Sequence, residues 1–424
     1  MKKAPVELTI EGMHINGAGL SEYNNREVYV WGALSGEVVL AKIMKKKRVR
    51  YEAVVIEVLK PSKRRQTPTE AHYLSSSPWD MMTFKSEKML KQKLASDFLS
   101  KNGFDTGKLK LHSPGSSYAY RNKMEFSFFE DDGRFSLAFY KRAGRGKIPI
   151  TGSRLASDVI NSAASSIVDF LNTKSLQGRP LKSLILRSND SEEVVAGLFV
   201  TEEINMNGFE LKKPLNGLRV YYSNPKSPAS VIDSLLFSVG DDFLDEQING
   251  FDLRFGLNSF FQVNTHMFKK ALRSIDKHMD YSKPYLDYYS GIGSISISLG
   301  KKLKGAILVD SNSEAINYAR LNIMRAGLSS FQAKGNAAES LTDLISSKYN
   351  LIVDPPRSGL HKKVITKILG VLPEQIIYMS CNIETQARDI ALLQAGYEVT
   401  SSELFNFFPR TPHIESLFVL KKRS

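Results

Sequence analysis

The sequence predicts an α/β protein with three domains, and two patterns support this prediction. Residues 1–62 contain short segments of alternating apolar and polar residues, which are typical of a small, OB-like β-barrel. Residues 256–424 alternate strand-like and helix-like segments, which is typical of an open, Rossmann-like parallel sheet. Residues 63–255 mix both kinds of segment, and we expect a central α+β domain there. A chain of 424 residues, 42% of them hydrophobic, can bury more than one core.

The predicted barrel has four strands and a strongly basic turn. The strands are expected at Val6–Ile10, Glu27–Val30, Glu37–Ile43 and Tyr51–Leu59. Four basic residues fall at the expected tip of the last hairpin: Lys45, Lys46, Lys47 and Arg48. Such a run is either a solvated loop or a nucleic-acid contact, and both interpretations stay open.

The central domain is expected to begin with an amphipathic helix after a basic linker. Leu90, Leu94 and Phe98 recur at helical spacing and therefore share one face. Asn102-Gly103 supplies a helix stop signal.

Two later segments of this domain, 118–123 and 140–147, interleave aromatic and basic side chains. This pattern suits the binding of single-stranded RNA, and it suits an ordinary half-buried hairpin equally well. The candidate RNA contacts here are Arg121, Lys123 and Arg142.

The composition restricts the class of protein and its setting. The net charge of +14 favours a polyanionic partner, most often nucleic acid, although it also suits charge that serves solubility alone. A single cysteine excludes a disulfide framework, a cysteine-based zinc site and an iron–sulfur cluster held by the chain. It also suits a reducing, cytoplasmic setting. The chain has no run of about 18 apolar residues and no signal-peptide core, so we expect no membrane partner.

The C-terminal domain is predicted from strands whose carboxyl ends carry glycine or polar residues. Strands are expected at Pro284–Tyr289, Ala306–Val309, Leu351–Val353 and Ile376–Met379, and helices at Ser294–Lys302 and Ser313–Ala326. In an open parallel sheet these strand ends meet at one edge, and ligands bind across that edge.

A nucleoside site is predicted at the first two of these strand ends. Gly291 and Gly293 let the backbone approach a ligand closely, and Asp310 can accept hydrogen bonds from both ribose hydroxyls. The dinucleotide fingerprint Gly-x-Gly-x-x-Gly is incomplete, because position 296 is serine. S-adenosylmethionine fits this pattern better than a dinucleotide, since it has a ribose but no pyrophosphate. The pattern therefore favours a methyltransferase.

The single cysteine, Cys381, lies between a predicted buried strand and a helix that Asn382 can cap. A lone cysteine is usually a small buried hydrophobe. At this junction the helix dipole is expected to lower the pKa of the thiol below about 8.5, which predicts a nucleophile.

The chain carries four short motifs in the order Phe260-x-Gln262-x-Asn264, Asp354-Pro355-Pro356, Ser380-Cys381-Asn382 and Thr411-x-His413-x-Glu415. In this order they resemble the motifs of the RNA uracil-5-methyltransferase family, which makes 5-methyluridine in ribosomal and transfer RNA. Arg357 follows the two prolines, where amino-group methyltransferases usually carry an aromatic residue, and this disfavours that chemistry.

The resemblance implies a class I methyltransferase domain behind an RNA-binding TRAM domain, with S-adenosylmethionine as the cofactor. It implies that Cys381 is the nucleophile and that Glu415 is the base. The expected cofactor contacts are Gln262, Tyr289, Gly291, Gly293, Ser294, Asp310, Asn336 and Asp354. Arg357 is a further candidate RNA contact.

Two features depart from the family pattern. Many TRAM-bearing members hold an iron–sulfur cluster through four cysteines, and the equivalent positions here are Thr69, Ser75, Pro78 and Ser153. We therefore expect no cluster. Ile383 stands where the family often has proline, which a first helical turn tolerates.

The expected function is the formation of 5-methyluridine in 23S ribosomal RNA by a monomeric enzyme. The tRNA T-loop uridine is an alternative substrate, and a catalytically silent RNA-binding or ribosome assembly factor is an alternative class. An RNA cytosine-5-methyltransferase is disfavoured, because its usual mechanism needs two cysteines and the chain has one.

Overall fold

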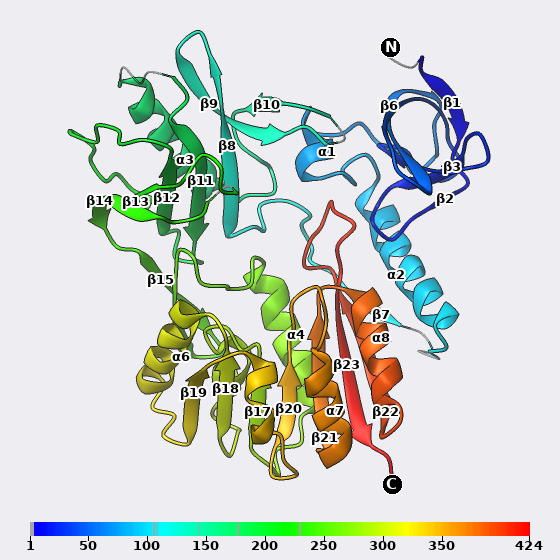
Figure 1. The fold of residues 1–424 in the computed structure, drawn as a ribbon, viewed down its shortest axis with the longest axis vertical. Helices are drawn as coiled ribbons and strands as arrows, with labels where there is room; N and C mark the ends of the chain where they lie inside the picture. The colour runs from blue at the N-terminus through cyan, green and yellow to red at the C-terminus, as the bar shows by residue number, and fades with distance from the viewer. Residues whose placement is uncertain are drawn as a thin grey trace.

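The computed structural model describes residues 4–424 except 105, 106, 108, 143, 175, 177 and 229. Residues 1–3 of the predicted barrel and Ala143 of the 140–147 segment therefore lie outside the described residues. The described chain forms sheets of six, seven and eight strands and a two-stranded hairpin (Figure 1). This confirms the predicted α/β class. In the part of the chain that the structure describes, no helix is both long enough and apolar enough to cross a membrane.

The N-terminal sheet curls into a small barrel, drawn in blue in Figure 1. Its strands are β1 (Val6–Thr9), β2 (Gly12–Met13), β3 (Gly19–Glu22), β4 (Glu27–Trp31), β5 (Val38–Lys46) and β6 (Arg50–Lys60). Val28, Val30 and Val39 are fully buried, because alternate residues of a strand face the same side. The four predicted strands are confirmed. The pattern does not reveal β2 and β3, because the glycines at positions 17 and 19 indicate a loop.

The central sheet is mostly antiparallel and has the order β10-β9-β8-β11-β12-β13-β14. Its strands are β8 (Lys123–Asp131), β9 (Arg134–Tyr140), β10 (Lys147–Ile150), β11 (Leu181–Ser188), β12 (Val194–Val200), β13 (Leu215–Tyr222) and β14 (Ser234–Gly240). Helix α3 (Asp158–Asn172) packs on one face through Ile160, Ile167 and Leu171. The short helix α1 (Tyr73–Ser76) and the hairpin β15 (Phe243–Ile248) and β16 (Phe251–Gly256) connect this sheet to its neighbours.

The C-terminal sheet has the order β19-β18-β17-β20-β21-β23-β22-β7. Its strands are β17 (Tyr285–Tyr288), β18 (Ala306–Asp310), β19 (Phe331–Gly335), β20 (Asn350–Val353), β21 (Gln375–Ser380), β22 (Tyr397–Phe405), β23 (Glu415–Lys422) and β7 (Lys110–His112). The first five strands of the order are parallel, and β23 runs antiparallel to both β21 and β22. The strand sequence reverses between β17 and β20, which is where open sheets of this kind bind ligands.

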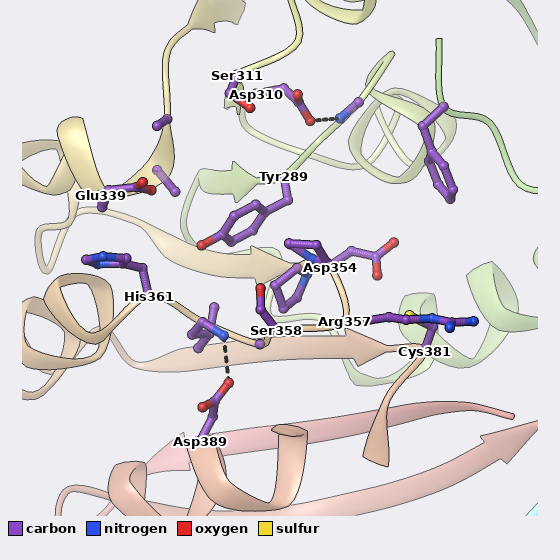
Figure 2. Close-up of a pocket in the computed structure, with 18 of the residues that line it drawn as sticks. Tyr289, Asp310, Ser311, Glu339, Asp354, Arg357, Ser358, His361, Cys381 and Asp389 are labelled. Carbon is purple, nitrogen blue, oxygen red and sulfur yellow. Dashed lines mark hydrogen bonds between the residues drawn. The ribbon is translucent and has the colours of Figure 1, made fainter. Parts of the chain in front are cut away.

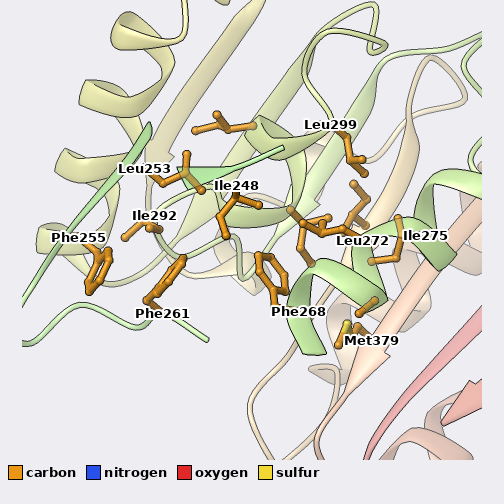
Figure 3. Close-up of a cluster of buried hydrophobic side chains, with 14 of the residues drawn as sticks. Ile248, Leu253, Phe255, Phe261, Phe268, Leu272, Ile275, Ile292, Leu299 and Met379 are labelled. Carbon is orange, nitrogen blue, oxygen red and sulfur yellow. The ribbon is translucent and has the colours of Figure 1, made fainter. Parts of the chain in front are cut away.

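Helices cover both faces of this sheet (Figure 1). They are α2 (Phe84–Lys101), α4 (Thr265–His278), α5 (Ser294–Ser298), α6 (Ser313–Arg325), α7 (Lys362–Val371) and α8 (Ile383–Leu393), with 3₁₀ turns at Ala338–Ser340 and Thr342–Leu344. Ile377 and Met379 of β21 join the core on one face, which Figure 3 shows with α4, and Ile376 and Tyr378 join the core on the other. Strands that are buried on both faces read as continuous apolar runs, which is why the sequence predicts them well.

The segment that contains α2 and β7 lies in the predicted central domain but packs with the C-terminal sheet. Strand β7 pairs in parallel with β22, and α2 contributes Ala95 and Leu99 to the core on one face. Leu90, Leu94 and Phe98 do share a face of α2, but they are only half-buried. The fully buried stripe of α2 is Glu87, Lys91, Ala95 and Leu99. The predicted domain boundaries at 62 and 255 stay predictions.

Candidate active site

A cavity of about 1140 Å³ opens at the carboxyl ends of β17, β18, β20 and β21. Figure 2 shows Asp310 and Cys381 at opposite ends of the cavity, and Glu339 and Glu415 also line it. Figure 2 shows Tyr289 and Asp354 between these two ends. The sheet topology thus brings together side chains from four strand ends that are far apart in the sequence.

The glycine loop shapes the first end of the cavity. Gly291 and Gly293 have φ values of 55° and 86°, which L-residues with side chains rarely adopt. A Cβ atom on Gly293 would lie 2.5 Å from Ile297 Cδ1, so the loop requires glycine there. Asp310 Oδ2 accepts a hydrogen bond of 2.9 Å from the Gly291 N–H, which fixes the carboxylate beside the loop (Figure 2).

Five of the eight expected cofactor positions line the cavity: Gln262, Tyr289, Gly291, Asp310 and Asp354. The other three, Gly293, Ser294 and Asn336, are not among the residues that line it. Ser294 is buried as the first residue of α5, and the Asn336 N–H donates to the Asp310 carbonyl at 2.9 Å. These roles stay predictions.

Hydrogen bonds to other segments of the chain hold the backbone around Gln262 in place. The Asn122 side chain donates to the Gln262 carbonyl at 3.0 Å. Asn264 caps α4 by accepting from the Met267 N–H at 3.1 Å, and its Nδ2 donates to the Phe407 carbonyl at 2.9 Å. The Gln262 amide therefore reaches Asp354, with Nε2 and Oδ2 separated by 3.5 Å.

Asp287 is buried, and Asp354 is half-buried in the wall of the cavity. Burial raises the pKa of Asp354 to about 7, and the charge of Asp287 adds to this effect. Burial also raises the pKa of Asp287 to about 7, although its Oδ2 accepts a hydrogen bond from Ser296 Oγ at 2.6 Å. Burial therefore disfavours the charged form of both carboxyl groups.

Antiparallel pairing of β21 with β23 brings the predicted nucleophile and base together. Ser380 pairs with Ser416, so the next residue of β21 and the previous residue of β23, Cys381 and Glu415, are neighbours across the two strand ends. Glu415 is 5% exposed. Burial raises the pKa of Glu415 well above its usual range, and the charge of Asp354 raises it further.

The expectation of a lowered thiol pKa is wrong. Burial raises the pKa of Cys381 to about 11, and the charges of Glu415 and Asp354 contribute to the rise. Arg357 opposes the rise through its charge and a hydrogen bond to the thiol. Asn382 does cap α8, accepting from the Glu384 N–H at 3.1 Å, but burial and the two carboxylates outweigh the helix dipole.

Arg357, which the sequence nominates as an RNA contact, lies beside Cys381 (Figure 2). Three further side chains line the cavity: Phe260, Phe408 and His413. The sequence motifs contain Phe260 and His413, whereas nothing in the sequence points to Phe408. Phe260 is 60% exposed, which is unusual for a large apolar side chain. Burial and nearby cations, first of all Arg357, lower the pKa of His413 to about 4. Their places inside the Phe-x-Gln-x-Asn and Thr-x-His-x-Glu motifs are the signals that could have found Phe260 and His413.

The other basic candidates lie outside this cavity. Lys45 and Lys46 end β5, and Lys47 forms a 2.5 Å ion pair with Glu52 across the hairpin. Arg142 stacks 4.4 Å from the Trp31 ring centre and donates to the Leu74 carbonyl at 2.5 Å, so it joins the barrel to the central sheet. Burial lowers the pKa of Lys123 to about 8.

Two of the four positions equivalent to cluster cysteines, Thr69 and Ser153, line a second cavity of about 810 Å³. Hydrogen bonds organise this region. The Asp80 carboxylate accepts from the Thr69 N–H at 2.6 Å, from the Thr69 hydroxyl at 2.8 Å and from the Tyr118 hydroxyl.

The fold and the cavity define a class I methyltransferase domain combined with a small β-barrel. The tRNA (uracil-5-)-methyltransferase family model matches residues 85–423. The chain therefore belongs to this family, and it is an RNA methyltransferase.

Relatives agree with this assignment. An uncharacterized RNA methyltransferase of Caldanaerobacter subterraneus subsp. tengcongensis is 25% identical over 443 residues, which cover 98% of each chain. One from Streptococcus mutans is 26% identical and covers 99% of this chain and 97% of its own. The tRNA (uracil-54, C5)-methyltransferase of Pyrococcus abyssi, solved with S-adenosyl-L-homocysteine, superposes with a TM-score of 0.81 at 21% identity. That match covers 98% of this chain and all of the other, and it shows the shared fold.

Proposed function

We propose that this protein transfers a methyl group from S-adenosylmethionine to carbon 5 of a uridine in RNA through a covalent intermediate on Cys381. The observation that carries the proposal is that Cys381, Glu415 and Asp310 line the same cavity. S-adenosylmethionine and a uracil base that share this cavity would meet between Tyr289 and Asp354.

The residues suit the chemistry that carbon 5 needs, because this carbon is a poor nucleophile on its own. The Cys381 thiolate adds to carbon 6, and the electrons of the C5–C6 double bond move to the carbonyl oxygen. Carbon 5 of the resulting enolate takes the methyl group, and S-adenosylhomocysteine leaves. Glu415 then removes the proton from carbon 5, the double bond re-forms and the thiolate is expelled.

The cofactor end of the cavity supports the same reaction. Asp310 lines the cavity, and the Gly291 and Asn312 N–H groups donate to its two carboxylate oxygens, which can also accept from both ribose hydroxyls. The solved Pyrococcus abyssi relative, which contains S-adenosyl-L-homocysteine, has the same fold.

The target base must leave its stack to reach Cys381, which costs a few kcal/mol unless the uridine lies in a loop. Phe260 and Phe408 line the cavity and offer rings on which a displaced base can stack. This arrangement favours a uridine in an RNA loop over one in a continuous helix.

We propose 23S ribosomal RNA as the substrate, because the basic barrel suits a large structured RNA. The T-loop uridine of tRNA is the second candidate, since the family model and the Pyrococcus abyssi relative both carry tRNA names. A silent assembly factor would not need Cys381 and Glu415 side by side in the cavity. We further propose that the enzyme acts as a monomer in the cytoplasm.

The test is to map 5-methyluridine in ribosomal and transfer RNA from cells with and without the gene, and to repeat the reaction with purified protein on unmodified transcripts. The proposal expects one or more uridines to lose the methyl group without the gene and to regain it with wild-type protein only. Complementation by Cys381→Ala would refute the covalent route, and unchanged RNA in all samples would refute the activity.

A further inference from the structure

The loop from residue 354 to residue 360 carries Arg357 to the Cys381 thiol, and it is exposed at its centre. Residues 356–358 are exposed, and Gly359 has a φ of 79°. A turn in which the Gly359 N–H donates to the Pro356 carbonyl at 2.9 Å shapes the loop. A turn of this kind leaves the loop free to move as a unit unless another element holds it.

Helix α8 holds the loop through one of its faces. The Arg357 carbonyl accepts hydrogen bonds from Asn382 Nδ2 at 2.9 Å and from Thr385 Oγ1 at 3.1 Å. One turn further along, the Arg388 guanidinium donates to the Ser358 carbonyl at 2.9 Å. The Leu360 N–H donates to Asp389 Oδ2 at 2.7 Å, a bond drawn as a dashed line in Figure 2.

Asp389 is fully buried, and its carboxylate is where helix α8 holds the loop. Its Oδ2 also accepts from the Tyr378 hydroxyl of β21 at 2.7 Å, and its Oδ1 accepts from Arg388 Nε at 2.9 Å. The loop approaches so closely that a Cβ atom on Gly359 would lie 2.5 Å from Asp389 Oδ2. Strand β21, helix α8 and the loop therefore meet at one carboxylate.

Cys381 immediately precedes this helix. The element that holds the Arg357 loop is thus also the element that begins at the thiol. From this geometry we propose that Thr385, Arg388 and Asp389 are positioning residues, which hold the guanidinium of Arg357 against Cys381. Arg388 and Asp389 also line the cavity, but the proposed role acts through the Arg357 loop. The inference rests on the proposed function, in which Cys381 is the nucleophile, and it assigns roles to residues that the four motifs leave without one.

The chain has one cysteine, so alkylation of the purified protein reports on Cys381 alone. The probes are iodoacetamide, which is neutral, and iodoacetate, which is an anion that a neighbouring guanidinium attracts. The variants are Arg357→Ala, Thr385→Val and Thr385→Ser. The matched control is Thr400→Val on β22. The Thr400 hydroxyl also donates to a backbone carbonyl, which is that of Val419 at 3.2 Å. Rates are measured at pH 8 by mass spectrometry without RNA.

We expect Arg357→Ala to slow alkylation by iodoacetamide about tenfold, because a hydrogen bond to an ionised group is lost. Thr385→Val should slow it about threefold, the effect of one weaker bond. In both variants iodoacetate should be slowed more than iodoacetamide, because the guanidinium no longer lies beside the thiol. A general change in access to the thiol would slow both reagents equally. Thr385→Ser should restore the wild-type rates, and Thr400→Val should keep them.

The inference is overturned if Thr385→Val reacts like wild type while Arg357→Ala is slow, or if Arg357→Ala itself reacts like wild type. Equal slowing of both reagents in Thr385→Val would also overturn it. Asp389→Asn, which keeps the side-chain volume, provides a second variant if Thr385→Val changes the circular dichroism spectrum. Failure of the proposed function is seen separately, as methyl transfer by Cys381→Ala, because alkylation requires neither RNA nor turnover.

Discussion

Lys91 and Glu87 form a buried ion pair that joins α2 to the chain segment leading to Glu415. Their side chains are 1% and 0% exposed, and Nζ lies 3.2 Å from Oε1. Lys91 Nζ also donates to Asn406 Oδ1 at 2.6 Å and to the Phe408 carbonyl at 3.0 Å. The second carboxylate oxygen of Glu87 accepts from the Arg410 N–H at 3.0 Å.

Replacing Lys91 with methionine keeps most of the side-chain volume but leaves the Glu87 carboxylate buried without its cation. Breaking a buried pair in this way costs about 3–5 kcal/mol. Glu87→Gln combined with Lys91→Met should be less destabilised than Lys91→Met alone, because an amide needs no counter-charge. The matched control is Lys93→Met on the same helix. Lys93 pairs with Asp97 at 2.6 Å, but the side chains are 69% and 47% exposed, so its loss should cost about 0.5 kcal/mol or less.

The assay is guanidinium unfolding followed by the fluorescence of Trp79 in a Trp31→Phe background. Trp79 is fully buried, and its ring centre lies 5.8 Å from Lys91 Nζ, so it reports on the unfolding of this region. The reasoning is refuted if Lys91→Met is no less stable than Lys93→Met, or if the double variant is less stable than Lys91→Met.

Two further predictions concern activity, and a third concerns RNA binding. Cys381→Ala should abolish methyl transfer but leave S-adenosylmethionine affinity, measured by calorimetry, within about twofold, because the thiol lies at the far end of the cavity from Asp310; substantial turnover would exclude the thiol as nucleophile. Between pH 7 and 9, single-turnover adduct formation should rise about tenfold per unit, because the pKa of Cys381 is about 11 and only the thiolate reacts; a flat profile would show that deprotonation does not limit the rate. Replacing the basic residues 45–48 with glutamine should weaken RNA binding and flatten its salt dependence, with each lost phosphate contact reducing the slope by about 0.7–0.9; an unchanged slope would assign the barrel tip another role.

The sequence predicts those parts of the site that depend on one strand and its following loop. Asp310 and Cys381 directly follow apolar runs, so their position at the carboxyl edge of the sheet follows from strand periodicity alone. The cap formed by Asn382 is equally local. These predictions need no knowledge of which strands are neighbours.

The remainder depends on contacts between distant segments. The raised pKa of Cys381 comes largely from burial and from Glu415, which reaches the thiol only through the pairing of β21 with β23. Glu87 and Lys91 have the composition of a solvated helix face, and only the partners on residues 406–410 make their burial possible. Strand β7 has three residues, too few for a periodic signal.

In the proposed mechanism Glu415 resolves a covalent bond between Cys381 and RNA, and the variant Glu415→Gln tests this role. Methyl transfer to carbon 5 precedes proton removal, so the variant should form the thiol–carbon 6 bond and transfer the methyl group but fail to release the product. With labelled S-adenosylmethionine and substrate RNA, a protein–RNA adduct that carries one labelled methyl group should accumulate and survive a denaturing gel. The adduct should disappear when Cys381→Ala is added. Normal turnover by Glu415→Gln, or inactivity without an adduct, would contradict the account.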